Sequence, residues 1–139
     1  MNDEKISVLY VQAGKYPEVV EIEDNLESMQ KLVGGYIEEY MPFEDEVAIV
    51  CNEEGKINGL QPNRAIYGEI NNGKKEVIDI VFGDFFVCYA PVESEKFLSL
   101  PEDMKQKYSE MFKYPERFYL INNSVVAEPY KPVQKDLER

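Results

Sequence analysis

The chain has 139 residues, with 15 Lys or Arg against 27 Asp or Glu, a formal net charge of −12 and no histidine. This length suits one domain, and a hydrophobic content of 44% supplies a core and excludes an intrinsically disordered chain. The missing histidine excludes triads, zinc-protease motifs and iron sites that depend on imidazole. The acidic balance argues against direct binding of nucleic acid or an anionic membrane, which depends on Lys and Arg.

Two further features indicate a cytoplasmic protein. The N-terminal residues lack the basic and apolar regions of a secretory signal, and the longest apolar runs are far shorter than a membrane span of about 20 residues. Cys51 and Cys88 each lie in an apolar, strand-like run without CxxC spacing, which matches neither a zinc site nor a redox motif. We expect both to be reduced and buried.

The first half of the chain predicts a hairpin, a helix and two further strands. β-Branched and aromatic residues indicate strands at 6–11, 18–22, 36–41 and 47–51. A helix is predicted over about 24–34, with Asp24 as its N-cap, Glu27 completing a capping box and Gly34 ending it. An acidic turn separates the last two strands.

The second half predicts a β-rich centre, a second helix and a closing hairpin. Strands are expected at 65–70, 77–82, 85–90, 118–121 and 124–127, and residues 60–64 are expected to form a loop. Apolar residues at helical intervals predict a helix over about 100–112, with a capping-box spacing from Ser99 to Glu102. The predicted fold class is α+β, a mainly antiparallel sheet with two principal helices. It forms one domain over 1–128, followed by a mobile or loosely packed tail over 129–139.

The negative charge is concentrated in the N-terminal part of the chain. Residues 1–54 hold 14 acids and three lysines, a net charge of −11, whereas the remainder has a net charge of −1. Helix capping and the helix dipole explain Glu23, Asp24 and Glu27. The remaining acids form a candidate partner-binding set, which is Glu38, Glu39, Glu44, Asp45, Glu46, Glu53 and Glu54.

These acids support two interpretations. They form either a solvated surface that keeps the protein soluble, or a surface that binds a basic or nucleic-acid-binding protein. In the second case they can imitate DNA, because same-face carboxylates on a strand repeat at about 6.6 Å. That repeat is close to two phosphate steps of about 3.4 Å along a DNA strand. The adjacent acids Glu38 and Glu39 must point to opposite faces of their strand.

An alternative from a different class is a carboxylate-based, divalent-metal-dependent enzyme or a small-ligand-binding protein. Its candidate residues are Asn63, Arg64, Asp79 and Asp84, since Arg binds a carboxylate or phosphate bidentately and paired acids serve catalysis. The sequence contains neither a calcium-loop pattern nor a phosphate-binding glycine motif. We therefore assign no catalytic residue, metal ligand or cofactor.

Several motifs occur together in a recognisable order. They include Leu32-Val33-Gly34-Gly35-Tyr36, Asn52-Glu53-Glu54-Gly55-Lys56, Gly59-Leu60-Gln61-Pro62-Asn63-Arg64 and Asp79-Ile80-Val81-Phe82-Gly83-Asp84. From Lys5 to about Ala127 the chain resembles the domain of unknown function 3846 family, small acidic proteins of Gram-positive bacteria associated with plasmids and conjugative elements. The matching polar and glycine positions are Asn52, Gly55, Asn63, Arg64, Gly83 and Asp84.

The resemblance implies a cytoplasmic protein of a mobile genetic element and supplies no catalytic residues. Acidic proteins of such elements include DNA mimics that block restriction enzymes and other host defences, an argument by analogy only. The sequence therefore predicts a non-enzymatic accessory protein that binds a basic protein partner.

Overall fold

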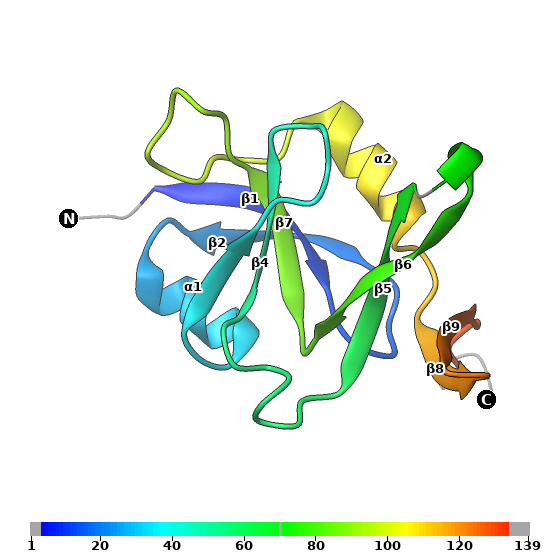
Figure 1. Ribbon diagram of the computed structural model, residues 1–139. Coiled ribbons are helices and arrows are strands. Elements are labelled where there is room, and N and C mark those ends of the chain that lie inside the picture. Colours follow the sequence, from blue (N-terminus) through cyan, green and yellow to red (C-terminus); the bar gives the residue numbers. More distant parts are fainter. Residues whose placement is uncertain (1–3, 70, 134–139) are drawn as a thin grey trace.

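A computed structural model describes residues 4–69 and 71–133 of the protein (Figure 1). The elements in chain order are β1 (Lys5–Val11), β2 (Glu18–Glu23), α1 (Leu26–Val33), β3 (Ile37–Tyr40), β4 (Val47–Asn52), β5 (Pro62–Glu69), a 3-10 turn (Asn71–Gly73), β6 (Lys75–Phe82), β7 (Phe85–Tyr89), α2 (Glu102–Met111), β8 (Glu116–Ile121) and β9 (Ser124–Pro129). They confirm the predicted α+β class with a mainly antiparallel sheet and two helices.

A five-stranded sheet forms the centre of the fold. Its strand order is β2-β1-β7-β4-β3, and every neighbouring pair is antiparallel. Side chains alternate between the two faces of each strand, so β1, β4 and β7 contribute to two separate apolar clusters. Strand β4 is buried along its whole length because it lies inside the sheet and both of its faces are covered.

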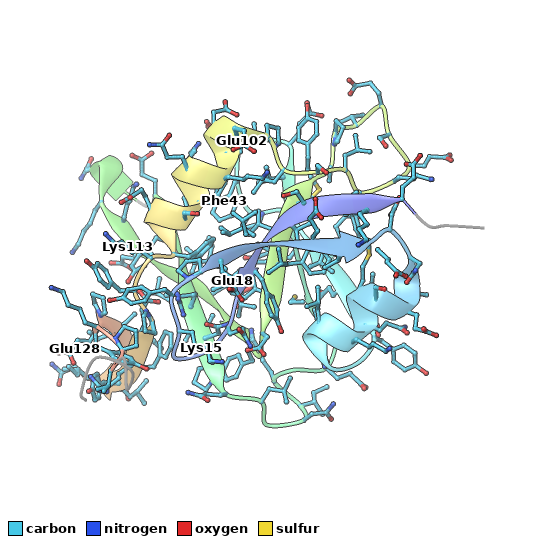
Figure 2. The ribbon with its side chains drawn as sticks, turned by 180° about the vertical axis from the view of Figure 1, so that it is seen from behind. Lys15, Glu18, Phe43, Glu102, Lys113 and Glu128 are labelled. Atoms are coloured by element: carbon cyan, nitrogen blue, oxygen red, sulfur yellow. The ribbon has the colours of Figure 1, made fainter. Side chains whose placement is uncertain are left out.

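Different elements cover the two faces of this sheet (Figure 1). On one face α1 packs Met29 and Val33 against the sheet cluster that includes Phe86. On the other face lie α2 and the β5–β6 hairpin. Phe43, labelled in Figure 2, lies with its ring centroid 5.1 Å from that of Tyr108 and so anchors the β3–β4 loop beneath α2.

Both helices begin later than the sequence predicts, because the predicted caps have other partners. Asn25, not Asp24, caps α1, and its Oδ1 accepts a hydrogen bond from the Ser28 N–H at 2.8 Å. Pro101 is the N-cap of α2. Ser99 instead accepts a hydrogen bond from the Ser7 N–H at 2.9 Å, which ties the entry of α2 to β1.

The prediction of a loop over residues 60–64 is wrong at its end, since β5 begins at Pro62. Local propensity favours a loop here, but Asn63 and Arg64 are 1% exposed and are held by bonds to distant segments. Tertiary contacts therefore extend the strand.

The closing hairpin is confirmed, with Asn122 and Asn123 at positive φ in its turn. This β8–β9 hairpin forms its own two-stranded sheet and packs beside β5 and β6 (Figure 1). The chain beyond it is packed at first, because Tyr130 N–H donates to Pro115 O at 2.9 Å and its ring lies 3.9 Å from the Arg117 guanidinium. The end of the tail predicted to be mobile, residues 134–139, lies outside the described residues.

A helix must be long and apolar to cross a membrane. Neither α1 nor α2, the two α-helices of the described ranges, is long and apolar enough to cross a membrane.

Candidate functional site

A cleft of about 340 Å³ opens at the β3 edge of the sheet, on the side covered by the β5–β6 hairpin. Strands β3 and β4 form one wall, β6 forms the other, and residues 53–57 of the loop after β4 border it. We call it the acidic cleft, defined by its four carboxylates, Glu38, Glu53, Glu54 and Asp79. The predicted partner-binding set thus contributes three of these acids, and the alternative set contributes the fourth.

Strand geometry places the two β3 acids on opposite sides. Glu38 is in register with Cys51, whose side chain faces the cleft, whereas Glu39 is in register with Val50 on the α1 side. This is the alternation that the sequence predicts. Tyr40, two residues after Glu38, also lines the cleft.

Gly55 allows the loop after β4 to approach β6 closely. A Cβ atom at this position would lie 2.8 Å from the main-chain oxygen of Phe82, closer than side-chain atoms normally approach. Glycine is therefore required on steric grounds, and this close approach brings Glu53 and Glu54 to the same cleft as Asp79.

Asp79 is the carboxylate of the cleft that is held by an ion pair and a main-chain hydrogen bond. Its Oδ1 lies 2.9 Å from Lys56 Nζ and accepts a hydrogen bond from the Ile80 N–H at 2.8 Å. Burial acts to raise the pKa of Asp79, but bonds from Lys56, the Ile80 amide and the Tyr40 hydroxyl outweigh it and hold that pKa below its ordinary value. Asp79 is therefore ionised at neutral pH.

Negative charge in the cleft contributes, after burial, to the raised pKa values of two neighbouring groups. Burial and then the Asp79 carboxylate raise the pKa of Tyr40 to about 12. Burial raises the pKa of Cys51 to about 11, with further contributions from Glu38 and Asp79. A negative potential that opposes loss of a proton also favours a bound cation.

Three of the four carboxylates have no cationic partner in the described part of the chain. Lys56 pairs with Asp79, but no Lys or Arg nitrogen there lies within 4.0 Å of Glu38, Glu53 or Glu54. All three side chains are exposed. Chemically, the arrangement can receive ammonium or guanidinium groups from outside the protein.

A metal site would require several of these carboxylates to lie close together. Within residues 4–69 and 71–133, no three His, Cys, Asp or Glu side chains are grouped closely enough to hold a metal ion.

The β3–β4 loop holds the other three acids of the partner-binding set, and two of them make internal contacts. Asp45 Oδ2 lies 2.6 Å from Lys107 Nζ and accepts a hydrogen bond from the Tyr108 hydroxyl at 2.8 Å. Glu46 accepts a hydrogen bond from the Val92 N–H at 2.7 Å. Glu44 is exposed in the turn. The structure therefore uses Asp45 and Glu46 to attach this loop to α2 and to the segment after β7.

We expect Asp45→Asn to lower the free energy of unfolding at pH 7 by about 1–2 kcal/mol, the effect of weakening a charged hydrogen bond. The bonds from Lys107 and Tyr108 hold the pKa of Asp45 below its ordinary value. This stabilisation is therefore present above the unfolded-state pKa and is lost as pH falls through the folded-state pKa. Urea unfolding between pH 2 and 7 should show a flatter acid branch for Asp45→Asn. An unchanged acid branch, matching that of the control Glu44→Gln, would contradict this role.

Asn63 and Arg64 of the alternative ligand-binding set are buried inside the protein. Arg64 donates from Nε to Phe112 O at 3.0 Å, from Nη1 to Asn63 Oδ1 at 2.8 Å and from Nη2 to Lys15 O at 2.7 Å. Asn63 Nδ2 donates to the main-chain oxygens of Val11 and Gly83. These bonds join β5 to the β1–β2 turn and to the end of α2, which is a structural role.

The two aspartates of that set are not brought together. Asp84 Oδ1 accepts from the Ala13 N–H at 3.1 Å, and Oδ2 accepts from the Tyr10 hydroxyl at 3.4 Å. It lines a different hollow, beside α1, from the cleft that holds Asp79. The chain turns at Gly83, whose φ is +84°, after β6 and before Asp84, so the two aspartates lie in different hollows.

The cleft lining also includes residues that the sequence does not single out as candidates, among them Tyr40, Lys56 and Ile57. The two-residue period from Glu38 indicates Tyr40, and adjacency to Glu53-Glu54-Gly55 indicates the other two. Ile57 is 82% exposed, so an apolar group borders the acidic one.

Comparison with protein families identifies the domain. The family model described as domain of unknown function 3846 matches residues 6–113. The chain belongs to the domain of unknown function 3846 family. The match contains the acidic cleft and ends before the β8–β9 hairpin, so the cleft lies in the part of the chain that defines this family. Comparison with curated proteins gives no match, and comparison with solved structures gives none either.

Proposed function

We propose that this member of the domain of unknown function 3846 family is a non-enzymatic binding protein whose acidic cleft receives Lys or Arg side chains of a basic protein partner. One observation carries the proposal: Glu38, Glu53 and Glu54 line the cleft and have no cationic partner among the described residues, while Asp79, paired with Lys56, lines the opposite wall. A basic partner would neutralise charges that the fold leaves uncompensated.

Carboxylates grouped beside apolar surface favour such an interaction more than scattered ones do. The cleft walls of Tyr40, Ile80 and Phe82 lower the local dielectric constant and strengthen attraction to a cation. The overall charge of −12 adds long-range steering of a basic partner.

Imitation of DNA is a narrower form of this proposal. The partner would then be a nucleic-acid-binding protein of the host, and the protein would act in the cytoplasm as an accessory factor of a mobile genetic element. Two free, buried cysteines suit a reducing compartment. In this form the cleft carboxylates would occupy positions that phosphates take in the partner's basic groove.

Affinity purification with the full chain tests the proposal. We expect a basic protein to be retained at about 50 mM salt and released by about 200 mM, because contacts between exposed charges weaken as the Debye length shortens. Retention should be unaffected by a chelator. A duplex DNA competitor should displace the partner if the interaction imitates DNA.

Two results would count against the proposal. Failure to recover any basic protein at low salt would contradict it directly. Chelator-sensitive retention, together with a melting temperature raised by magnesium, manganese or calcium, would favour the alternative of a metal-dependent enzyme or ligand-binding protein.

A further inference from the structure

We propose that a groove between β6 and β9 binds an extended segment of the same partner, with apolar side chains next to the Lys or Arg residues in the acidic cleft. This inference rests on the proposed function and specifies the chemistry of the partner. It assigns a role to the β8–β9 hairpin, which the acidic cleft alone leaves unexplained.

The groove has a volume of about 540 Å³, and its walls combine apolar and polar surface. It is lined by Tyr67, by residues 75–80 of β6 and by residues 124–127 of β9. Ile78 is 53% exposed, and Val125 and Val126 are each 39% exposed. Large apolar side chains left in contact with water along a groove favour a docking surface over an ordinary hydrophilic one.

The groove continues directly into the acidic cleft. Asp79 and Ile80 line both hollows, and β6 borders the groove with residues 75–80 and the cleft with residues 79–82. The eight residues of β6 extend about 23 Å at a rise of about 3.3 Å per residue. An extended segment of about seven residues can therefore lie along both hollows.

Strand β6 also has a free edge. Among the described residues it pairs only with β5, so its other edge has no strand partner. At Ile80 the main-chain N–H donates to the Asp79 carboxylate at 2.8 Å. A segment that adds to such an edge gains main-chain hydrogen bonds, while side-chain pockets provide specificity.

Charge selects the occupant. A second copy of this chain would bring the Glu38, Glu53 and Glu54 carboxylates of two proteins that each carry a net charge of −12 toward the same region. A basic segment instead meets opposite charge at the cleft and, in the groove, the exposed apolar side chains of Ile78, Val125 and Val126. Glu128, labelled in Figure 2, lies on the β8–β9 hairpin. Residues 116–133 carry equal numbers of acids and bases, so this segment adds no net charge to the acidic cleft.

Two labelled peptides separate the contributions of cleft and groove. The first is Lys-Lys-Gly-Val-Thr-Val-Thr-Val, and the second replaces each valine with serine. We expect the first to bind the full chain at least tenfold more tightly at 50 mM salt. Val126→Gln, which alters the groove, should weaken the first peptide about fivefold and leave the second unchanged. Leu120→Gln, on the same hairpin but outside the groove lining, is the matched control and should change neither.

The outcomes distinguish this inference from the proposed function. Equal binding of both peptides, with no effect of Val126→Gln, would overturn the groove and leave the acidic cleft as the binding site. Failure of both peptides to bind would contradict both proposals. If light scattering shows a dimer that Val126→Gln dissociates, a second copy occupies the groove and the inference is wrong.

Discussion

Arg64→Ala should lower the free energy of unfolding by roughly 3–5 kcal/mol, the range for removing one member of a buried charged network. The guanidinium is 1% exposed and donates to Phe112 O, Asn63 Oδ1 and Lys15 O. Removing it leaves these acceptors buried without a donor and opens a cavity. The total stability of a domain is only about 5–15 kcal/mol, so this loss is a large fraction of it.

The physical reason lies in what Arg64 connects. Its acceptors come from the β1–β2 turn, the end of α2 and its own strand, so one side chain fixes three segments. Burial lowers the pKa of Arg64 to about 10, and Glu116 partly opposes that shift, so the group remains charged at neutral pH. Burying this charge is unfavourable, but its hydrogen bonds fix the position of β5 relative to the β1–β2 turn and the end of α2.

Urea unfolding at pH 7 measures this effect. Arg64→Lys should also be destabilised, by at least about 2 kcal/mol, because an ammonium group cannot reproduce the planar fork of donors. Arg117→Ala, which removes an exposed arginine over the Tyr130 ring, should cost about 1 kcal/mol or less. A loss below 1 kcal/mol for Arg64→Ala would contradict the structural role of this residue.

Neutralising the acidic cleft should weaken binding of a basic partner by about ten- to a hundredfold. The change is Glu38→Gln with Glu53→Gln and Glu54→Gln. Each exposed charge pair contributes up to about 1 kcal/mol, and 1.4 kcal/mol corresponds to a tenfold change in affinity. Because these side chains are exposed and unpaired in the described chain, the triple variant should retain wild-type stability.

A second triple variant controls for overall charge. Glu27→Gln, Glu39→Gln and Glu44→Gln change the net charge by the same amount, at exposed positions that do not line the cleft. We expect its affinity to stay within about twofold of wild type at 50 mM salt, where the Debye length is about 14 Å and exposed charges outside the cleft are partly screened. Equal weakening by both triple variants would show that net charge, and not the cleft, attracts the partner.

The sequence predicts the sheet and its helices well because their signals are local. The runs of β-branched and apolar residues in β1 and β4, and the helical spacing in α1 and α2, are visible within a few residues of one another. The caps were harder to predict. Ser99 has a capping-box spacing, yet it bonds to Ser7 on a distant strand, and local propensity cannot reveal such a competitor.

The candidate site depends on contacts between distant parts of the chain. Composition singles out Glu38, Glu53 and Glu54, but only the fold shows that they share a cleft with Asp79. The same fold gives Asp45 internal partners that the sequence does not indicate, because Lys107 and Tyr108 on α2 lie more than 60 residues away in sequence. An arginine in a polar segment is a reasonable ligand-binding candidate. Two of the acceptors of Arg64, Phe112 O and Lys15 O, are distant in sequence, so local patterns cannot reveal its structural role.

The salt dependence of binding to a lysine-rich probe tests the central claim most directly. The affinity of a fluorescein-labelled octalysine peptide for the wild-type chain and the two triple variants would be measured from 25 to 200 mM salt, a range set by the screening length. The account predicts a steep decrease in log affinity with log salt for wild type and for the Glu27, Glu39 and Glu44 variant. It predicts a clearly smaller slope and weaker binding for the Glu38, Glu53 and Glu54 variant. Identical slopes and affinities for the two triple variants would contradict a binding site in the acidic cleft.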